Sequence, residues 1–144
     1  MTSDDGSAAL EFITVGVILL VPLAYLVIML GAIQEQSLGA EAAARHISRT
    51  IALSAGPESA AVAADDVLTG VIDEYGMDAE ATDVVLSCMP EGAECPTGGA
   101  TLRVTVTTVV RMPFVPEVLG LDSALAVPLE ATAVQKVGRG WGSG

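Results

Sequence analysis

Residues 6–33 read GSAALEFITVGVILLVPLAYLVIMLGAI. From residue 12 to residue 33 the stretch is about 22 residues long and carries no charged side chain. At a rise of about 1.5 Å per residue, a helix of this length reaches about 33 Å, which is enough to cross a hydrocarbon core of roughly 30 Å. We therefore predict a membrane-spanning helix. Glu11 stands at the mouth of this helix, where a carboxylate is costly to bury and calls for a functional reason.

The apolar stretch differs from a cleaved secretory signal. Such signals have a basic beginning, an apolar part of about 7–15 residues and a small-residue cleavage site after it. Here Asp4 and Asp5 precede the stretch, no basic residue does, and the apolar part is longer. We expect a retained anchor. A domain that is released by ordinary signal cleavage is the competing interpretation.

The helical pattern continues beyond the apolar stretch. Residues 34–55 are rich in Ala, Leu, Glu, Gln and Arg, which favour helices. Ala43, Ile47 and Ile51 recur at four-residue spacing on one side, and Glu41 and Arg45 form an i,i+4 acid-to-base pair. Gly56-Pro57 ends the pattern. The sequence thus predicts one long helix over about residues 10–53, half membrane-embedded and half amphipathic.

The remainder of the chain predicts a second helix and a small sheet. Residues 58–75 carry an apolar stripe at helical spacing, with Gly76 as the C-cap. Residues 83–89 and 101–106 read as strands, the second with strict alternation. The alternation slips at Thr107-Thr108, which predicts a bulge or the end of one-sided burial. A last strand is expected over about residues 124–134, after a linker bounded by Pro113 and Pro116.

Two details of the C-terminal part follow from single residues. Pro128 lacks a backbone N–H, so the last strand should lie at an edge of the sheet. The glycine-rich tail, residues 138–144, is expected to be disordered, with Trp141 exposed. The predicted fold class is α+β: a long N-terminal transmembrane and amphipathic helix, with a second helix packed against a small antiparallel sheet.

Charge argues against nucleic acid as a partner. The 144 residues include 18 acidic and six basic side chains, for a formal net charge of −12, and 51% are hydrophobic. Binding to phosphates needs clusters of Lys and Arg, whereas the six basic residues are scattered along this sequence. The acidity fits a soluble, self-repelling surface.

The two cysteines, Cys88 and Cys95, flank a Pro- and Gly-containing loop between two predicted strands. This setting brings them within the reach that a disulfide requires. Two unpaired cysteines in a reducing compartment are the alternative. A zinc site is disfavoured because the chain has no other cysteine and its single histidine, His46, lies on the long helix.

The orientation of the anchor rests on two opposing signals. Arg45 and Arg49 follow the predicted span, and no Lys or Arg precedes it. By the positive-inside rule, this distribution favours a cytoplasmic C-terminal part. Both arginines lie near the limit of that rule's range, however, and the cysteine pair favours an oxidising compartment. We expect an extracytoplasmic C-terminal domain.

No catalytic constellation is visible. His46 reads as a residue of the helix surface, and the paired carboxylates Asp65-Asp66 and Asp73-Glu74 read as the solvated face of the second helix. No segment has the ligand spacing of a calcium loop or the helix-opening pattern of a phosphate-binding loop. The expectation is a protein that is not an enzyme and takes no cofactor.

The junction at residues 6–12 resembles a known processing signal. A Gly, a small residue, a Glu as the fifth residue after the Gly and an aromatic residue as the sixth are found here as Gly6, Ser7, Glu11 and Phe12. This order resembles the class III signal of type IV pilin-like proteins. GSAALEF before a long apolar helix looks like the TadE-like minor pilins of tight-adherence (Flp-type, type IVb) pilus systems. The helical extension, the Cys pair and the closing strand agree with that resemblance more loosely.

The resemblance implies maturation and assembly. A prepilin peptidase would cut between Gly6 and Ser7, and the partners would be the membrane, other pilin-like subunits and the pilus inner-membrane platform. It divides the chain into a leader (1–6), a transmembrane and amphipathic spine (7–55), an extracytoplasmic headpiece (56–137) and the tail (138–144). Leaders of this family are usually basic, whereas residues 1–6 carry Asp4 and Asp5 and no base. Either the true start lies upstream or the orientation is set by other means.

Glu11 has two interpretations. After cleavage, the new amine of Ser7 in a neighbouring subunit would neutralise a buried Glu11 and fix the axial register of the two helices. Alternatively, Glu11 lies in the headgroup zone, where the N-terminal end of the helix dipole stabilises it. At the level of the whole protein, the alternative to a minor pilin is an unprocessed single-pass accessory or scaffold protein.

Overall fold

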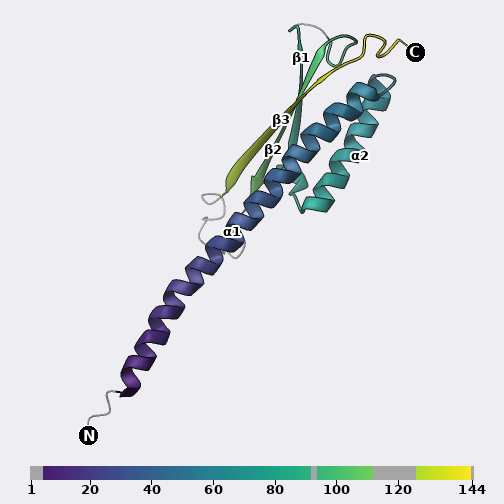
Figure 1. Cartoon of the computed structure of the whole chain (residues 1–144). Coiled ribbons are helices and arrows are strands. Elements are labelled where there is room, and N and C mark those ends of the chain that lie inside the picture. The colour runs from purple at the N-terminus through teal and green to yellow at the C-terminus, as the bar shows by residue number, and fades with distance from the viewer. Residues whose placement is uncertain (1–4, 92–93, 112–125, 144) are drawn as a thin grey trace. The chain divides into compact units, whose positions relative to one another are not determined.

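The structure, a computed structural model, describes residues 5–91, 94–111 and 126–143. It confirms the α+β class, with two helices, a short 3-10 helix and a three-stranded antiparallel sheet (Figure 1). The elements run in the order α1 (Asp5–Leu53), α2 (Pro57–Tyr75), η1 (Ala79–Ala81), β1 (Asp83–Met89), β2 (Thr101–Val110) and β3 (Val127–Lys136). The chain forms two compact units, Met1–Ala32 and Ile33–Gly144, which we describe separately.

Local signals act at both ends of α2, whereas α1 begins at Asp5, before the expected start at about residue 10. α1 is 49 residues long and continues through Pro22. α2 has Pro57 in its first turn, where a missing N–H costs nothing. Its N-terminus is closed by the Gly56 N–H, which donates to the Ser59 hydroxyl at 3.2 Å. Its C-cap, Gly76, is left-handed with φ 58°, as predicted.

The sheet belongs to the second unit and has the order β1-β2-β3, with β2 in the centre. Every second residue of β2 is buried, because the helices of this unit cover one face of the sheet (Figure 1). β3 is an edge strand, as Pro128 predicted. The bounds of β1 match the prediction. The expected linker and the expected first residues of the last strand lie outside the described residues.

The predicted change of phase at Thr107-Thr108 is wrong. Strands β2 and β3 pair without interruption from Thr101 opposite Lys136 to Val110 opposite Val127. Thr108 is 1% exposed and keeps the inward position of the alternation. Its hydroxyl lies 3.0 Å from the hydroxyl of Thr82, so each buried oxygen has a partner. A hydroxyl satisfied in this way can occupy a core position that the sequence pattern reserves for an apolar side chain.

The core of the second unit combines small helix residues with the apolar face of the sheet. Its members are mostly Ala and Ile from α1 and Leu and Val from β2: Ala40, Ala43, Ala44, Ile47, Ile51, Leu102, Val104 and Val106. The stripe predicted on the C-terminal half of α1 is thus the face that packs on the sheet. Alanine side chains let the helix lie close to the strands, which is why this face has few large residues.

At Gly39, α1 lies close against the end of α2. A Cβ added at Gly39 would lie 2.8 Å from the Cβ of Tyr75 and 2.9 Å from the sulfur of Met77. These distances are too short for non-bonded atoms, so the backbone of α1 or α2 would have to move to accommodate a side chain at Gly39. A glycine in the middle of a helix, which costs about 0.5–1 kcal/mol relative to alanine, is explained here by this contact.

We expect Gly39→Ala to destabilise the protein by about 1–2 kcal/mol, because the clash outweighs the gain in helix propensity. The matched control is Gly70→Ala in α2. A Cβ added at Gly70 would have no atom of the described residues within 4 Å, apart from its own helix backbone and chain neighbours. The control should be neutral or stabilising by up to about 1 kcal/mol. Thermal unfolding of the full chain in neutral detergent, followed by circular dichroism, measures both. Equal midpoints for the two variants would contradict the close contact.

Candidate functional site

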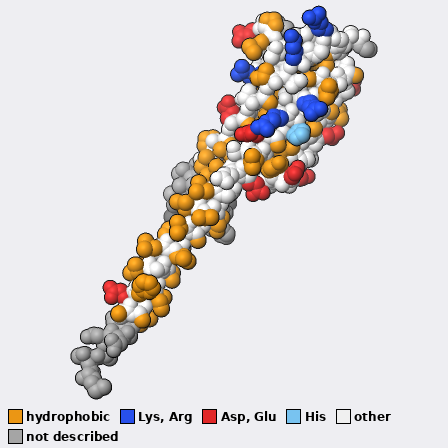
Figure 2. Space-filling view, viewed as in Figure 1, with side chains coloured by type: hydrophobic (Ala, Val, Ile, Leu, Met, Phe, Trp, Pro, Cys, Tyr) orange, Lys and Arg blue, Asp and Glu red, His pale blue; other side chains and the backbone are white. Residues whose placement is uncertain are grey.

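The first unit is a helix with an apolar surface. Leu10 and Phe12 are 69% and 81% exposed, and apolar side chains continue around the helix to Leu30 at 50%. They cover this segment in Figure 2. Within the described residues, one helix is long and apolar enough to cross a membrane, judged by length and composition. A surface of this kind is stable in lipid or against other helices, not in water.

One polar side chain inside this helix is held locally. The Thr14 hydroxyl donates to the carbonyl of Leu10 at 2.7 Å, which satisfies it without a partner from outside. Gly16 has open space around it, since an added Cβ would meet nothing within 4 Å among the described residues. The helix surface around Gly16 therefore permits the close approach of a second helix.

Glu11 is the only charged side chain between residues 8 and 34. It is exposed and lies one residue before Phe12, near the N-terminal end of α1. Gly6 and Ser7 precede it within the same helix. A carboxylate in this position lies where the membrane begins if the helix spans one. Both interpretations of Glu11 require this location: the carboxylate either pairs with an amine of a neighbouring subunit or lies in the headgroup zone.

The predicted disulfide is present. Cys88 near the end of β1 bonds to Cys95, with their Cα atoms 5.5 Å apart. Beyond the disulfide the loop is fixed to the last segment of the chain: the Gly99 N–H donates to the carbonyl of Val137 at 3.2 Å, and the Val137 N–H donates to Ala100 at 2.9 Å. A Cβ at Gly98 would lie 2.8 Å from the carbonyl oxygen of Arg139. The disulfide loop and the C-terminal segment are therefore packed against each other.

The prediction of an exposed Trp141 in a disordered tail is wrong. The indole N–H of Trp141 donates to the carbonyl of Ile51 at 2.8 Å, and the ring is partly buried against the core. The Gly142 N–H donates to the carbonyl of Ala55 at 3.1 Å. The last carbonyls of a helix lack partners within the helix, and this segment supplies a donor to one of them, that of Ile51, and to the carbonyl of Ala55 just beyond the helix. Trp141 can be picked out in the sequence, but its contact with the end of α1 is visible only in the structure.

Other ionisable residues show ordinary surface arrangements. His46 is exposed on α1, as predicted. Arg45 forms the predicted ion pair with Glu41, and Arg111 forms another with Asp78 at 3.0 Å. Across residues 5–91, 94–111 and 126–143, no group of three or more His, Cys, Asp or Glu side chains is arranged to hold a metal. The features that carry functional information are thus the apolar helix with Glu11 and the surface of the second unit.

Comparison of the chain with models of protein families, with curated proteins and with solved structures finds no match.

Proposed function

We propose that this protein is a minor pilin-like subunit, similar to the TadE-like proteins, that takes part in assembly of a tight-adherence (type IVb) pilus. A single observation carries the proposal. Glu11 is the only charged side chain between residues 8 and 34, five residues after Gly6, on a helix segment whose apolar side chains are mostly exposed. An uncovered helix of this length needs a membrane before assembly, and neighbouring helices could take the place of the lipid afterwards.

Maturation by a prepilin peptidase would create the partner of Glu11. The cut between Gly6 and Ser7 leaves an amine at Ser7, within the same apolar surroundings as the carboxylate of a neighbouring subunit. A buried carboxylate is tolerated when an opposite charge compensates it. Because one subunit supplies the amine and the other the carboxylate, the pair also sets the axial offset of the two helices. Phe12 and the small residues Ala8 and Ala9 would pack around it.

The headpiece would lie outside the cytoplasm, on an N-in, single-pass anchor in the inner membrane. The disulfide between Cys88 and Cys95 supports this orientation, since such bonds persist in oxidising compartments. A role in initiation, at the tip or in assembly fits better than that of main fibre subunit, because the main subunits of these systems are much shorter chains. In this proposal the protein binds other pilin-like subunits and the inner-membrane platform, takes no cofactor and is not an enzyme.

A second function is favoured by one observation. Asp4 and Asp5 occupy the segment where pilin leaders usually carry basic residues. An unprocessed single-pass scaffold protein of a pilus or secretion complex would have no need of a recognisable leader. The two functions differ in one measurable property, the N-terminus. The mature minor pilin begins at Ser7 when a prepilin peptidase is present, whereas the scaffold keeps residues 1–6.

A further inference from the structure

The two edges of the sheet differ in how they are protected. Edge strands expose unpaired N–H and C=O groups, and natural proteins blunt them with Pro or charged residues. β3 carries Pro128, Glu130 and Lys136. β1 has neither Pro nor a charge from residue 84 to residue 89, and among the described residues it pairs only with β2. The free side of β1 is therefore an open template for another strand.

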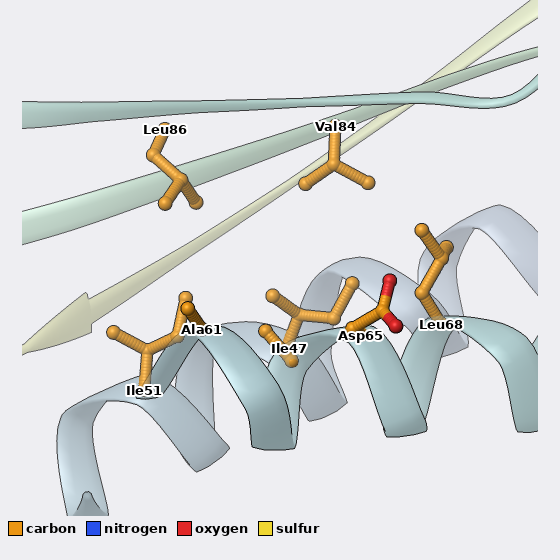
Figure 3. A pocket seen from close by; sticks show the side chains of 8 residues that line it. Ile47, Ile51, Ala61, Asp65, Leu68, Val84 and Leu86 are labelled. Atoms are coloured by element: carbon orange, nitrogen blue, oxygen red, sulfur yellow. The ribbon is translucent and has the colours of Figure 1, made fainter. Parts of the chain in front are cut away.

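An apolar groove runs beside this open strand. It has a volume of about 230 Å³ and lies between the inner face of β1, α2 and the C-terminal half of α1. Its lining residues are Ile47, Ile51, Ala61, Ala64, Asp65, Leu68, Val84 and Leu86 (Figure 3). A dry cavity of about 150 Å³ lined by such side chains holds a benzene molecule. The groove therefore has room for a large apolar side chain from outside.

The groove exists because short side chains face the edge of the sheet. Figure 3 shows Val84 and Leu86 pointing from β1 toward the helices, where α2 contributes the short side chain of Ala61. Leu86 remains 38% exposed although it lies on the inner face. The core cluster of β2 is covered almost completely, so the incomplete packing is specific to the strand that is also unprotected at its edge. Both features lie on the same side of the headpiece.

The charge beside the groove selects among possible occupants. Asp65 lines it, and its carboxylate points toward the sheet in Figure 3. Neither described ion pair involves Asp65. The next residue of α2, Asp66, is also exposed, and the whole chain has a formal net charge of −12. An incoming segment with Lys or Arg would gain from this field, whereas an acidic one would be repelled.

We propose that β1 and this groove bind an extended segment of a partner protein, which adds as a fourth strand. Alternate apolar side chains of the segment enter the groove, and a Lys or Arg of the segment meets Asp65. A second copy of this chain fits less well. Its strands β2 and β3 use their apolar faces in their own core, and its β1 brings Asp83 as its only charge. The proposal concerns only the second unit, Ile33–Gly144, and holds whether or not residues 1–6 are removed.

The test uses the full chain in neutral detergent and a fluorescein-labelled peptide of about eight residues, the length of a typical strand. Valine and leucine alternate with lysine and threonine in the peptide, and a matched peptide has glutamate in place of lysine. We expect the lysine peptide to bind at least about tenfold more tightly. Asp65→Lys should reverse the preference. Asp66→Lys, which makes the same change in net charge outside the groove lining, should keep it.

A second variant separates groove binding from adsorption to the detergent or to the acidic surface. Ala64→Leu fills the groove without adding charge and should weaken binding of the lysine peptide by about tenfold or more, with the thermal midpoint unchanged or raised. Bound peptide should slow amide hydrogen exchange in β1 and not in β3. Equal effects of the two Asp variants, or unchanged binding by Ala64→Leu, would overturn the proposal. Dimerisation of the protein alone, abolished by Ala64→Leu, would assign the groove to a second copy instead and would also overturn it.

Discussion

Replacing Glu11 with alanine should remove the protein from sheared surface filaments while leaving its insertion into the membrane unchanged. The variant makes the span more apolar, so insertion is not impaired. In an assembly it leaves the amine of Ser7 buried without its partner. Breaking a buried ion pair on one side costs about 3–5 kcal/mol, which is about two to three and a half powers of ten in an association constant. The measurement is the amount of the protein in the filament and membrane fractions of the same cells.

The matched control for this variant is Glu35→Ala. Glu35 is an exposed acid on the same helix, beyond the apolar stretch, and its removal changes the net charge equally. It should leave the filament fraction unchanged. Glu11→Gln should behave like Glu11→Ala, because an amide keeps the shape of the side chain but not its charge. If Glu11→Ala enters filaments as the native chain does, the carboxylate does not set the register, and its role is confined to the headgroup zone.

Loss of the disulfide is expected to have the next largest effect. The bond closes a short loop, for which the chain-entropy relation gives a stabilisation of about 2–3 kcal/mol. Combined Cys88→Ser and Cys95→Ser should lower the thermal midpoint of the headpiece accordingly. The loop also packs on the segment that holds Trp141, so the indole should become more accessible to a fluorescence quencher at temperatures below the transition.

Reductant provides the control for the disulfide. It should lower the midpoint of the native chain to that of the double serine variant and leave the variant unchanged. Mass spectrometry without reduction should show Cys88 linked to Cys95 in protein taken from its native compartment. Free thiols in that protein would contradict both the bond and the extracytoplasmic orientation, while a midpoint insensitive to reductant would contradict the stabilisation alone.

Elements with local signals could be predicted from the sequence. Gly56-Pro57 predicted the end of α1 and Gly76 the end of α2, since both act through backbone geometry that does not depend on the remainder of the fold. The cysteine pair could be predicted because a short loop between adjacent strands keeps the two residues close. Pro128 revealed an edge strand through a missing hydrogen-bond donor.

Features that depend on contacts distant in sequence could not be predicted. Thr108 reads as a break in an apolar pattern until Thr82 is seen beside it. Trp141 reads as part of a glycine-rich tail until the end of α1 is placed next to it. The sequence around Gly39 does not indicate its contact with Tyr75. The groove likewise depends on Ala61 and Ala64 lying opposite β1, which the sequence does not show. For the candidate site, the pattern at residues 6–12 located Glu11, whereas the groove was visible only in three dimensions.

The intact mass of the membrane-extracted protein, expressed with and without a prepilin peptidase, tests the central claim most directly. We predict that the mass falls by that of residues 1–6 only when the peptidase is present, so that the chain begins at Ser7. That result requires the N-terminus to face the cytoplasmic side, where the peptidase acts, and so tests the orientation as well. An unchanged mass in cells where the same peptidase matures a known prepilin would contradict the proposal and leave a single-pass scaffold protein.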